Sequence, residues 1–115
     1  MIFYKDHDMK TLKFRPHLVT EILEGRKTST WRVFDEKDLT VGDQLELINK
    51  ETLKVFARAE ITNVREKPLG EIEEEDFKGH EKYENREAMF AEYKKYYGDR
   101  VNEETVVKMI EFNLL

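Results

Sequence analysis

The sequence predicts an α+β fold, a small mixed and partly closed β-barrel with helices flanking the barrel. Five or six segments have strand character, and they do not alternate regularly with helices, which argues against a doubly wound sheet. Helical patterns are confined to a short stretch before residue 25 and to an acidic stretch between residues 70 and 98. We expect the last strand to return and pair near the first.

The N-terminal part predicts one strand. We expect residues 1–9 to be loose, or Ile2, Phe3 and Tyr4 within them to add an edge strand. Residues 11–15 alternate apolar and charged side chains, which predicts a strand with Leu12 and Phe14 facing the core. Lys13 and Arg15 should then point outward, unless this strand borders a cleft.

A helix, a glycine and a strand follow in direct succession. Residues 16–23 begin with proline and carry apolar side chains on one side, which predicts a short helix. Gly25 can adopt the left-handed conformation that ends a helix. Residues 28–33 then predict an extended strand, so this region forms a sharp corner.

The middle of the chain predicts a β-hairpin. Residues 41–43 give a turn signal, residues 44–49 a strand, residues 50–52 a turn and residues 55–64 a partner strand rich in β-branched side chains. Pro68 and Gly70 close this β-rich half.

The rest of the chain predicts helices and a final strand. Residues 71–77 predict one short helical turn, and residues 85–97 a longer helix with Asn85 as its cap. Residues 106–114 predict the last strand.

Composition narrows the class of protein. With 115 residues we expect a single domain over 1–115, and thirteen aromatic residues argue against disorder although 39% of the residues are charged. The absence of cysteine excludes disulfides and thiolate metal sites, and with three scattered histidines we expect no metal and no cofactor. No signal peptide or membrane-spanning run is apparent, so we expect a soluble cytoplasmic protein without a membrane partner.

Charge is distributed unevenly. The net charge is −5, yet residues 1–34 hold seven basic and four acidic side chains, a local balance of +3. Bulk attraction to long nucleic acid is therefore unexpected. A small anionic or nucleotide-sized ligand, or a short single-stranded segment, suits this distribution better.

Reactive side chains concentrate between residues 24 and 32. Lys27 could be a base or nucleophile if its amine is partly neutral, or a charged residue that binds a phosphate or carbonyl. Thr30 could be a nucleophile or only a strand former. Strict alternation would place Lys27 and Thr30 on opposite faces, so their cooperation requires a bend at Thr28 or Ser29. Arg32 could hold an anion by a bidentate fork or form a buried ion pair with a glutamate.

Three motifs together resemble the ASCH domain of the PUA-like superfamily: residues 25–32, the Gly42-Asp43 pair before a strand, and residues 81–83 leading into the 87–89 helix. The resemblance implies a small β-barrel with a cleft beside the first motif, and recognition of RNA or a modified nucleoside. One branch of that family removes the acetyl group from N4-acetylcytidine with a lysine, a threonine and a glutamate. Matched by motif, these would be Lys27, Thr30 and Glu81.

Two function classes remain open from the sequence. The first is a module that binds RNA or a nucleoside in a basic cleft around Gly25–Arg32, with ligand contacts from Arg26, Trp31 and Arg32. The second is a metal-free amidohydrolase that uses Lys27, Thr30 and Glu81. Trp31 could instead be a core side chain, and we expect the remaining candidates to serve capping, surface or packing roles: His17, His80, Tyr93, Tyr96 and Tyr97.

Overall fold

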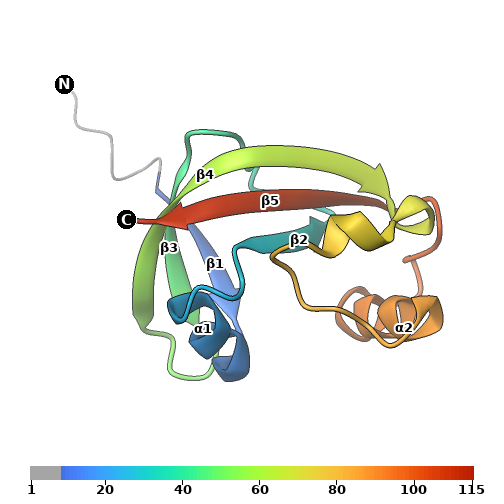
Figure 1. Ribbon diagram of the computed structural model, residues 1–115, viewed down its shortest axis with the longest axis horizontal. Coiled ribbons are helices and arrows are strands. Elements are labelled where there is room, and N and C mark those ends of the chain that lie inside the picture. The colour runs from blue at the N-terminus through green and yellow to red at the C-terminus, as the bar shows by residue number, and fades with distance from the viewer. Residues whose placement is uncertain (1–8) are drawn as a thin grey trace.

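One mixed five-stranded sheet curls into a half-barrel in the computed structural model, which describes residues 9–115 (Figure 1). Its order is β1-β3-β4-β5-β2. The expected α+β, partly closed barrel is confirmed, whereas the possible edge strand within residues 1–9 would be formed by Ile2, Phe3 and Tyr4, which lie outside the described residues. The strands are β1 (Lys10–Phe14), β2 (Ser29–Val33), β3 (Gln44–Asn49), β4 (Val55–Pro68) and β5 (Val106–Leu114).

Strand pairing departs from the sequence prediction at one point. The hairpin of β3 and β4 is antiparallel as expected, and β1 pairs in parallel with β3. The last strand, β5, lies between β4 and β2 and does not neighbour β1, so the prediction that it pairs near the first strand is wrong. The reason is that β4 runs beyond the predicted residue 64 to Pro68, and β5 follows it along its length.

Two helices flank the sheet, as the periodicity predicts. Helix α1 (Pro16–Leu23) has proline in its first turn and ends before Gly25, whose φ of 83° is left-handed. Helix α2 (Arg86–Tyr97) is capped by Asn85, whose side chain accepts a hydrogen bond from the Ala88 amide. The single helical turn expected at residues 71–77 is instead two 3-10 turns, Leu69–Glu71 and Glu74–Phe77.

The buried side chains form two cores. The first core joins α1 to β1, β3, β4 and the second half of β5, and the second core joins α2 to β2 and the first half of β5. Leu12 and Phe14 belong to the first, as predicted, and Trp31 and Tyr93 to the second. This division leaves room between the two cores for a cleft.

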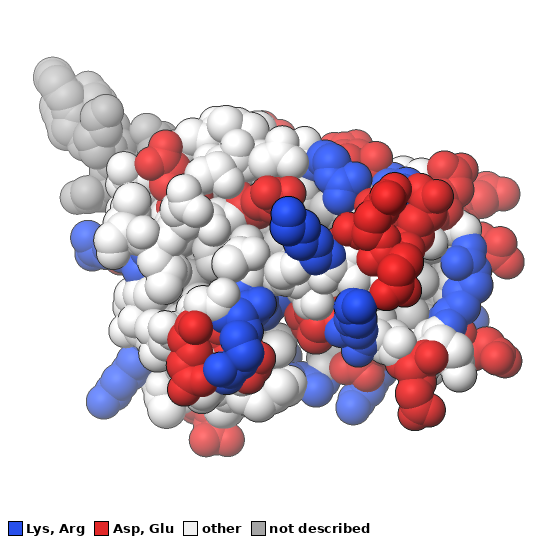
Figure 2. Space-filling model, in the orientation of Figure 1, with Lys and Arg blue, Asp and Glu red and all other residues white. Residues whose placement is uncertain are grey.

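One acidic cluster stands out on the face drawn in Figure 2. Figure 2 shows acidic side chains gathered over the segment that holds the 3-10 turns, which contains Glu71 and Glu73–Glu75. Within residues 9–115, neither helix has the length and apolar character needed to cross a membrane.

Candidate functional site

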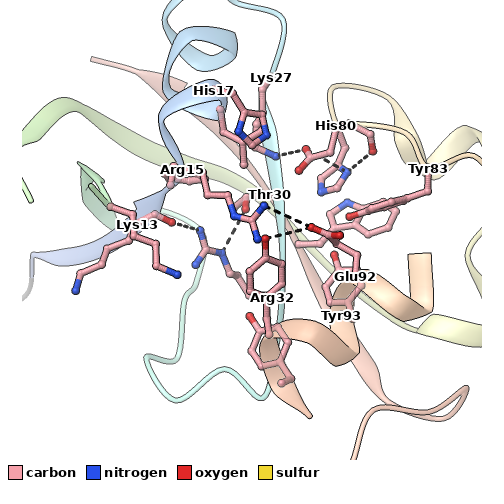
Figure 3. Close-up of a pocket in the computed structure, with 17 residues that line it drawn as sticks. Lys13, Arg15, His17, Lys27, Thr30, Arg32, His80, Tyr83, Glu92 and Tyr93 are labelled. Atoms are coloured by element: carbon pink, nitrogen blue, oxygen red, sulfur yellow. Dashed lines mark hydrogen bonds and ion pairs between the residues drawn. The ribbon is translucent and has the colours of Figure 1, made fainter. Parts of the chain in front are cut away.

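A cavity of about 400 Å³ opens between the two cores (Figure 3). Its walls come from β1, the start of α1, β2, the loop before α2, and α2 itself. Five of the six residues selected from the sequence line it: Lys27, Thr30, Trp31, Arg32 and Glu81. Arg26 is not among the lining residues, because its exposed guanidinium pairs with Glu21 and Glu24.

Lys27 and Glu81 form an ion pair in this cavity. Lys27 Nζ lies 2.6 Å from Glu81 Oε1, and the lysine side chain is only 4% exposed while the glutamate is 37% exposed. Burial lowers the pKa of Lys27, with a further lowering from Arg32, against the opposing effect of Glu81. Burial would raise the pKa of Glu81, but His80 and Lys27 outweigh it and lower that pKa. The pair therefore joins a lysine that loses its proton more easily than usual to a carboxylate that stays ionised.

One carbonyl brings these two distant segments together. The Gly79 carbonyl accepts hydrogen bonds from the Thr28 amide at 2.9 Å and the Ser29 amide at 3.1 Å. The Ser29 hydroxyl also donates to it, at 3.3 Å. Gly79 has a φ of 75°, and a Cβ there would clash with Thr28 Oγ1. A glycine is thus required where the Glu81 loop closes on the start of β2.

Thr30 and Arg32 share one face of β2, as the alternation predicts. Arg32 Nε donates to Thr30 Oγ1 at 3.3 Å, and Arg32 Nη2 donates to the Lys13 carbonyl at 3.1 Å. Lys27 precedes the first strand residue, Ser29, so strand alternation does not separate it from Thr30. The backbone bends at Arg26, before Lys27, and not at Thr28 or Ser29, yet Lys27 and Thr30 both line the cavity.

Arg32 is a cation in the cavity wall that has no carboxylate partner within residues 9–115. It stacks over the Phe14 ring at 5.0 Å, and burial lowers its pKa. Within residues 9–115 no carboxylate forms an ion pair with it; the predicted alternative of a buried pair with a glutamate is therefore not seen there. A half-buried cation without a counter-ion favours a ligand that supplies an anionic or strongly polar oxygen.

Trp31 and His80 form a stacked floor. Their rings lie 4.1 Å apart at 19°, and Phe77 packs against the tryptophan at 5.0 Å. His80 Nδ1 lies 2.8 Å from the Glu81 carbonyl oxygen, which can only accept, so Nδ1 carries the proton. Burial lowers the pKa of His80 to about 4, and the imidazole is neutral near pH 7. The expectation of a surface or capping role is wrong for His80, whose side chain is 3% exposed.

Tyrosines from α2 and the preceding loop form the opposite wall. Tyr93 and Tyr97 stack at 6.3 Å, and Tyr83 lies 6.4 Å from Tyr93. Burial raises the pKa of Tyr83 to about 12. The expected packing role is correct for Tyr93, but Tyr83, Tyr93, Tyr96 and Tyr97 all line the cavity as well. Sequence reasoning missed this wall, although the spacing of the three α2 tyrosines places them near one face.

The fold is similar to that of solved ASCH-domain structures. An ASCH domain from Lactobacillus crispatus superimposes with a TM-score of 0.70 at 16% identity, over 93% of this chain and 79% of that one. The ASCH protein of Zymomonas mobilis gives 0.67 at 13% identity, over 94% and 68%. The chain has the ASCH-domain fold. A protein from Pyrococcus furiosus also shares it, with a TM-score of 0.65 and 17% identity over 93% and 97%. No family model and no curated protein matches the sequence.

The ASCH fold explains why the selected residues converge. The helix-glycine-strand corner places Lys27, Thr30 and Arg32 on one wall, and the loop that leads into α2 brings Glu81 against them. Lys13 and Arg15 also line the cavity, because β1 does border a cleft. Among residues 9–115 no group of three or more His, Cys, Asp or Glu side chains is arranged to hold a metal ion.

Proposed function

We propose that this chain is an amidohydrolase that removes an acyl group from the exocyclic nitrogen of a modified nucleoside, with N4-acetylcytidine as the first candidate. The observation that carries the proposal is the 2.6 Å contact between Lys27 Nζ and Glu81 Oε1, with the lysine buried in a cavity that also contains Thr30. A buried lysine with a lowered pKa is suited to proton transfer, which an ordinary surface lysine is not.

The dimensions and walls of the cavity support a single nucleoside as ligand. A volume of about 400 Å³ lies near the small end of the range for small-molecule sites. The tyrosine wall offers aromatic rings against which a base can stack, while Trp31 and His80, stacked on each other and almost fully covered, form the floor of the cavity. Arg32, half-buried and without a carboxylate partner in the described residues, can donate to a carbonyl oxygen of the substrate.

The proposed reaction assigns one role to each polar group. Thr30 Oγ, or a water, attacks the acyl carbon and gives its proton to the neutral Lys27 amine. Arg32 stabilises the negative charge that develops on the acyl oxygen. Collapse of the tetrahedral intermediate breaks the carbon–nitrogen bond, and the Lys27–Glu81 pair returns the proton to the leaving amine. If Thr30 is the nucleophile, water then hydrolyses its ester, so that the products are the carboxylic acid and the free nucleoside.

The second candidate is a module that binds RNA or a nucleoside in the same cleft without catalysis. The free charge of Arg32 and the basic side chains at the cavity entrance favour it. In that case Lys27 stays protonated in its pair with Glu81 and serves as a hydrogen-bond donor.

Substitution of Lys27 by arginine separates the two functions. We expect wild type to convert N4-acetylcytidine to cytidine and acetate, measured by chromatography, and Lys27→Arg to lose that activity because arginine does not deprotonate near neutral pH. The matched control is Lys54→Arg, an exposed lysine outside the cavity lining. Unchanged deacetylation by Lys27→Arg would remove the lysine from proton transfer. No deacetylation by wild type, with retained nucleoside binding, would favour the binding module.

A further inference from the structure

We propose that the cavity entrance is a phosphate subsite, so that the preferred ligand is a nucleotide and not a free nucleoside. This inference rests on the proposed function for the identity of the base, but the phosphate subsite is argued separately from charge. We call five of the exposed or half-buried residues that line the cavity the rim: Lys13, Arg15, Lys50, Glu92 and Tyr96.

The charge of the cavity exceeds what a neutral nucleoside requires. Its lining holds five lysine and arginine side chains but only two carboxylates, Glu81 and Glu92, a balance of +3 in a chain whose net charge is −5. Glu81 is already paired with Lys27 deep in the cavity. A cavity with this local excess attracts an anion.

The rim lies at the outer end of the cavity. Tyr96 is 42% exposed, and Lys13 and Lys50 are also exposed, whereas Lys27 and Thr30 are each only 4% exposed. A nucleoside that places its amide near Thr30 would therefore extend its ribose, or a group attached to it, toward the rim. A phosphate carried by the ribose would reach the basic side chains there.

Contacts with Tyr96 and Glu92 position Arg15 at the rim, but its guanidinium keeps hydrogen-bond donors that are not used. Its guanidinium lies 4.4 Å from the centre of the Tyr96 ring, and Lys50 Nζ lies 5.8 Å from the same centre. Its ion pair with Glu92 is long, at 3.8 Å, and about a third of each side chain is exposed. Figure 3 shows the Arg15 guanidinium directed at the Glu92 carboxylate. Within the described residues, the side chains of Lys13, Arg15 and Lys50 donate no hydrogen bond.

The Glu92 carboxylate lies where the phosphate would bind and holds Arg15 only by a long ion pair. An incoming phosphate offers Arg15 a bidentate, closer partner than a carboxylate at 3.8 Å. Glu92 also accepts a hydrogen bond from the Tyr96 hydroxyl at 3.1 Å, which glutamine can preserve through its amide oxygen. Glu92→Gln therefore removes the competing charge without removing the partner of Tyr96.

Binding tests the subsite without relying on turnover. Trp31 is the only tryptophan and lies in the cavity, so its fluorescence reports occupancy. We expect cytidine 5′-monophosphate or cytidine 3′-monophosphate to bind at least about tenfold more tightly than cytidine at low salt, the scale of one charge-assisted contact. The trinucleotide UpCpU tests whether a phosphodiester serves equally well: tight binding of UpCpU identifies RNA as the source of the phosphate, and tight binding of a monophosphate alone identifies a free nucleotide.

Two variants and one control complete the test. Arg15→Ala should reduce the preference for phosphate to about twofold or less, and Glu92→Gln should increase it several-fold. Arg58→Ala removes a positive charge from β4 outside the cavity lining and should leave the preference unchanged. Equal affinity for cytidine and every phosphorylated form, or a preference that Arg15→Ala leaves intact, would overturn the subsite. If wild type binds the nucleotides tightly but does not deacetylate N4-acetylcytidine, the proposed hydrolysis fails and the phosphate subsite stands.

Discussion

Two lysine–carboxylate pairs of this molecule have nearly the same length and opposite environments. Lys27 lies 2.6 Å from Glu81 in the cavity, and Lys67 lies 2.7 Å from Asp76 beside the 3-10 turns. In the cavity the lysine is the buried partner, with 4% of its side chain exposed against 37% for the glutamate. Beside the turns the carboxylate is buried, at 2%, and the lysine is 21% exposed.

The pKa directions follow from this difference. Hydrogen bonds to Asp76 and Glu73 raise the pKa of Lys67. Burial would raise the pKa of Asp76, but hydrogen bonds from Lys67, the Glu73 amide and Arg65 outweigh it and lower that pKa. Both charges of this pair are thus stabilised, whereas burial lowers the pKa of Lys27 despite its contact with Glu81. Burial of the lysine, and not the length of the pair, is therefore what makes Lys27 the candidate for proton transfer in the proposed function.

The largest expected effect is on turnover. Lys27→Met should reduce hydrolysis of N4-acetylcytidine by about 10³-fold or more, because it removes the group that accepts the proton. Lys67→Met should leave turnover within about twofold, since Lys67 is outside the cavity lining. Steady-state kinetics of the two purified variants check this. Comparable losses in both would remove the functional difference between the pairs.

For the free energy of unfolding we expect the opposite result, because loss of the Lys67–Asp76 pair should matter more than loss of the Lys27–Glu81 pair. Asp76→Ala should lower the free energy of unfolding by about 2 kcal/mol, because Lys67, Arg65 and the Glu73 amide all lose an acceptor. Glu81→Ala should change it by less than about 1 kcal/mol, since its carboxylate is partly exposed and the lysine can deprotonate. Urea unfolding at pH 7 measures both. A larger loss for Glu81→Ala would make the cavity pair the structural one.

The loop that presents Glu81 gives a smaller effect with a matched control. Gly79→Ala should destabilise the fold by about 1–2 kcal/mol, from the left-handed backbone and the clash with Thr28 Oγ1. Gly42→Ala has a similar φ of 93° but no heavy atom within 4 Å of the added Cβ, so it should cost less. The double variant Thr28→Ala/Gly79→Ala removes the clash, so Gly79→Ala in that background should cost no more than Gly42→Ala does. Equal losses in the two single variants would show that the clash contributes nothing.

The smallest expected effect is in the pH dependence of folding stability. As pH rises, the contribution of Lys67 to stability falls and that of Lys27 becomes more favourable. The folded-state pKa of Lys67 is raised, so its stabilisation is present below about 10.5 and is lost as pH rises through the raised value. The folded-state pKa of Lys27 is lowered, so its cost is present below that lowered value and disappears as pH rises toward about 10.5. The stability gap between wild type and Lys27→Met should therefore move in favour of wild type as pH increases. Urea unfolding between pH 7 and pH 10 checks the sign, and movement toward the variant would contradict it.

Local patterns predicted the elements well, because the information is contained within each segment. The proline start of α1, the glycine that ends it, the Asn85 cap and the final strand all depend on neighbours in the sequence. The position of β5 between β4 and β2 depends on long-range pairing with a strand whose length the sequence understated. Periodicity says which face of a strand is buried, but not which strand lies beside it.

The site was predicted only in part for the same reason. Lys27, Thr30 and Arg32 are close in sequence, so the corner itself brings them together, and Glu81 was found only through the family resemblance. His80 reaches the site because the Gly79 carbonyl ties its loop to β2, a contact across fifty residues that no local pattern encodes. The tyrosine wall requires α2 to be docked in place before its face becomes a cavity wall.

A nitrogen-detected NMR titration of the lysine side chains tests the central claim most directly, because it follows Lys27 and Lys67 in one sample. Assignment comes from Lys27→Met and Lys67→Met, each of which removes one signal. We predict that Lys27 Nζ titrates below the usual lysine pKa of about 10.4 and that Lys67 Nζ titrates above it. A Lys27 amine that titrates at or above the usual value would contradict the account, since both pairs would then be structural.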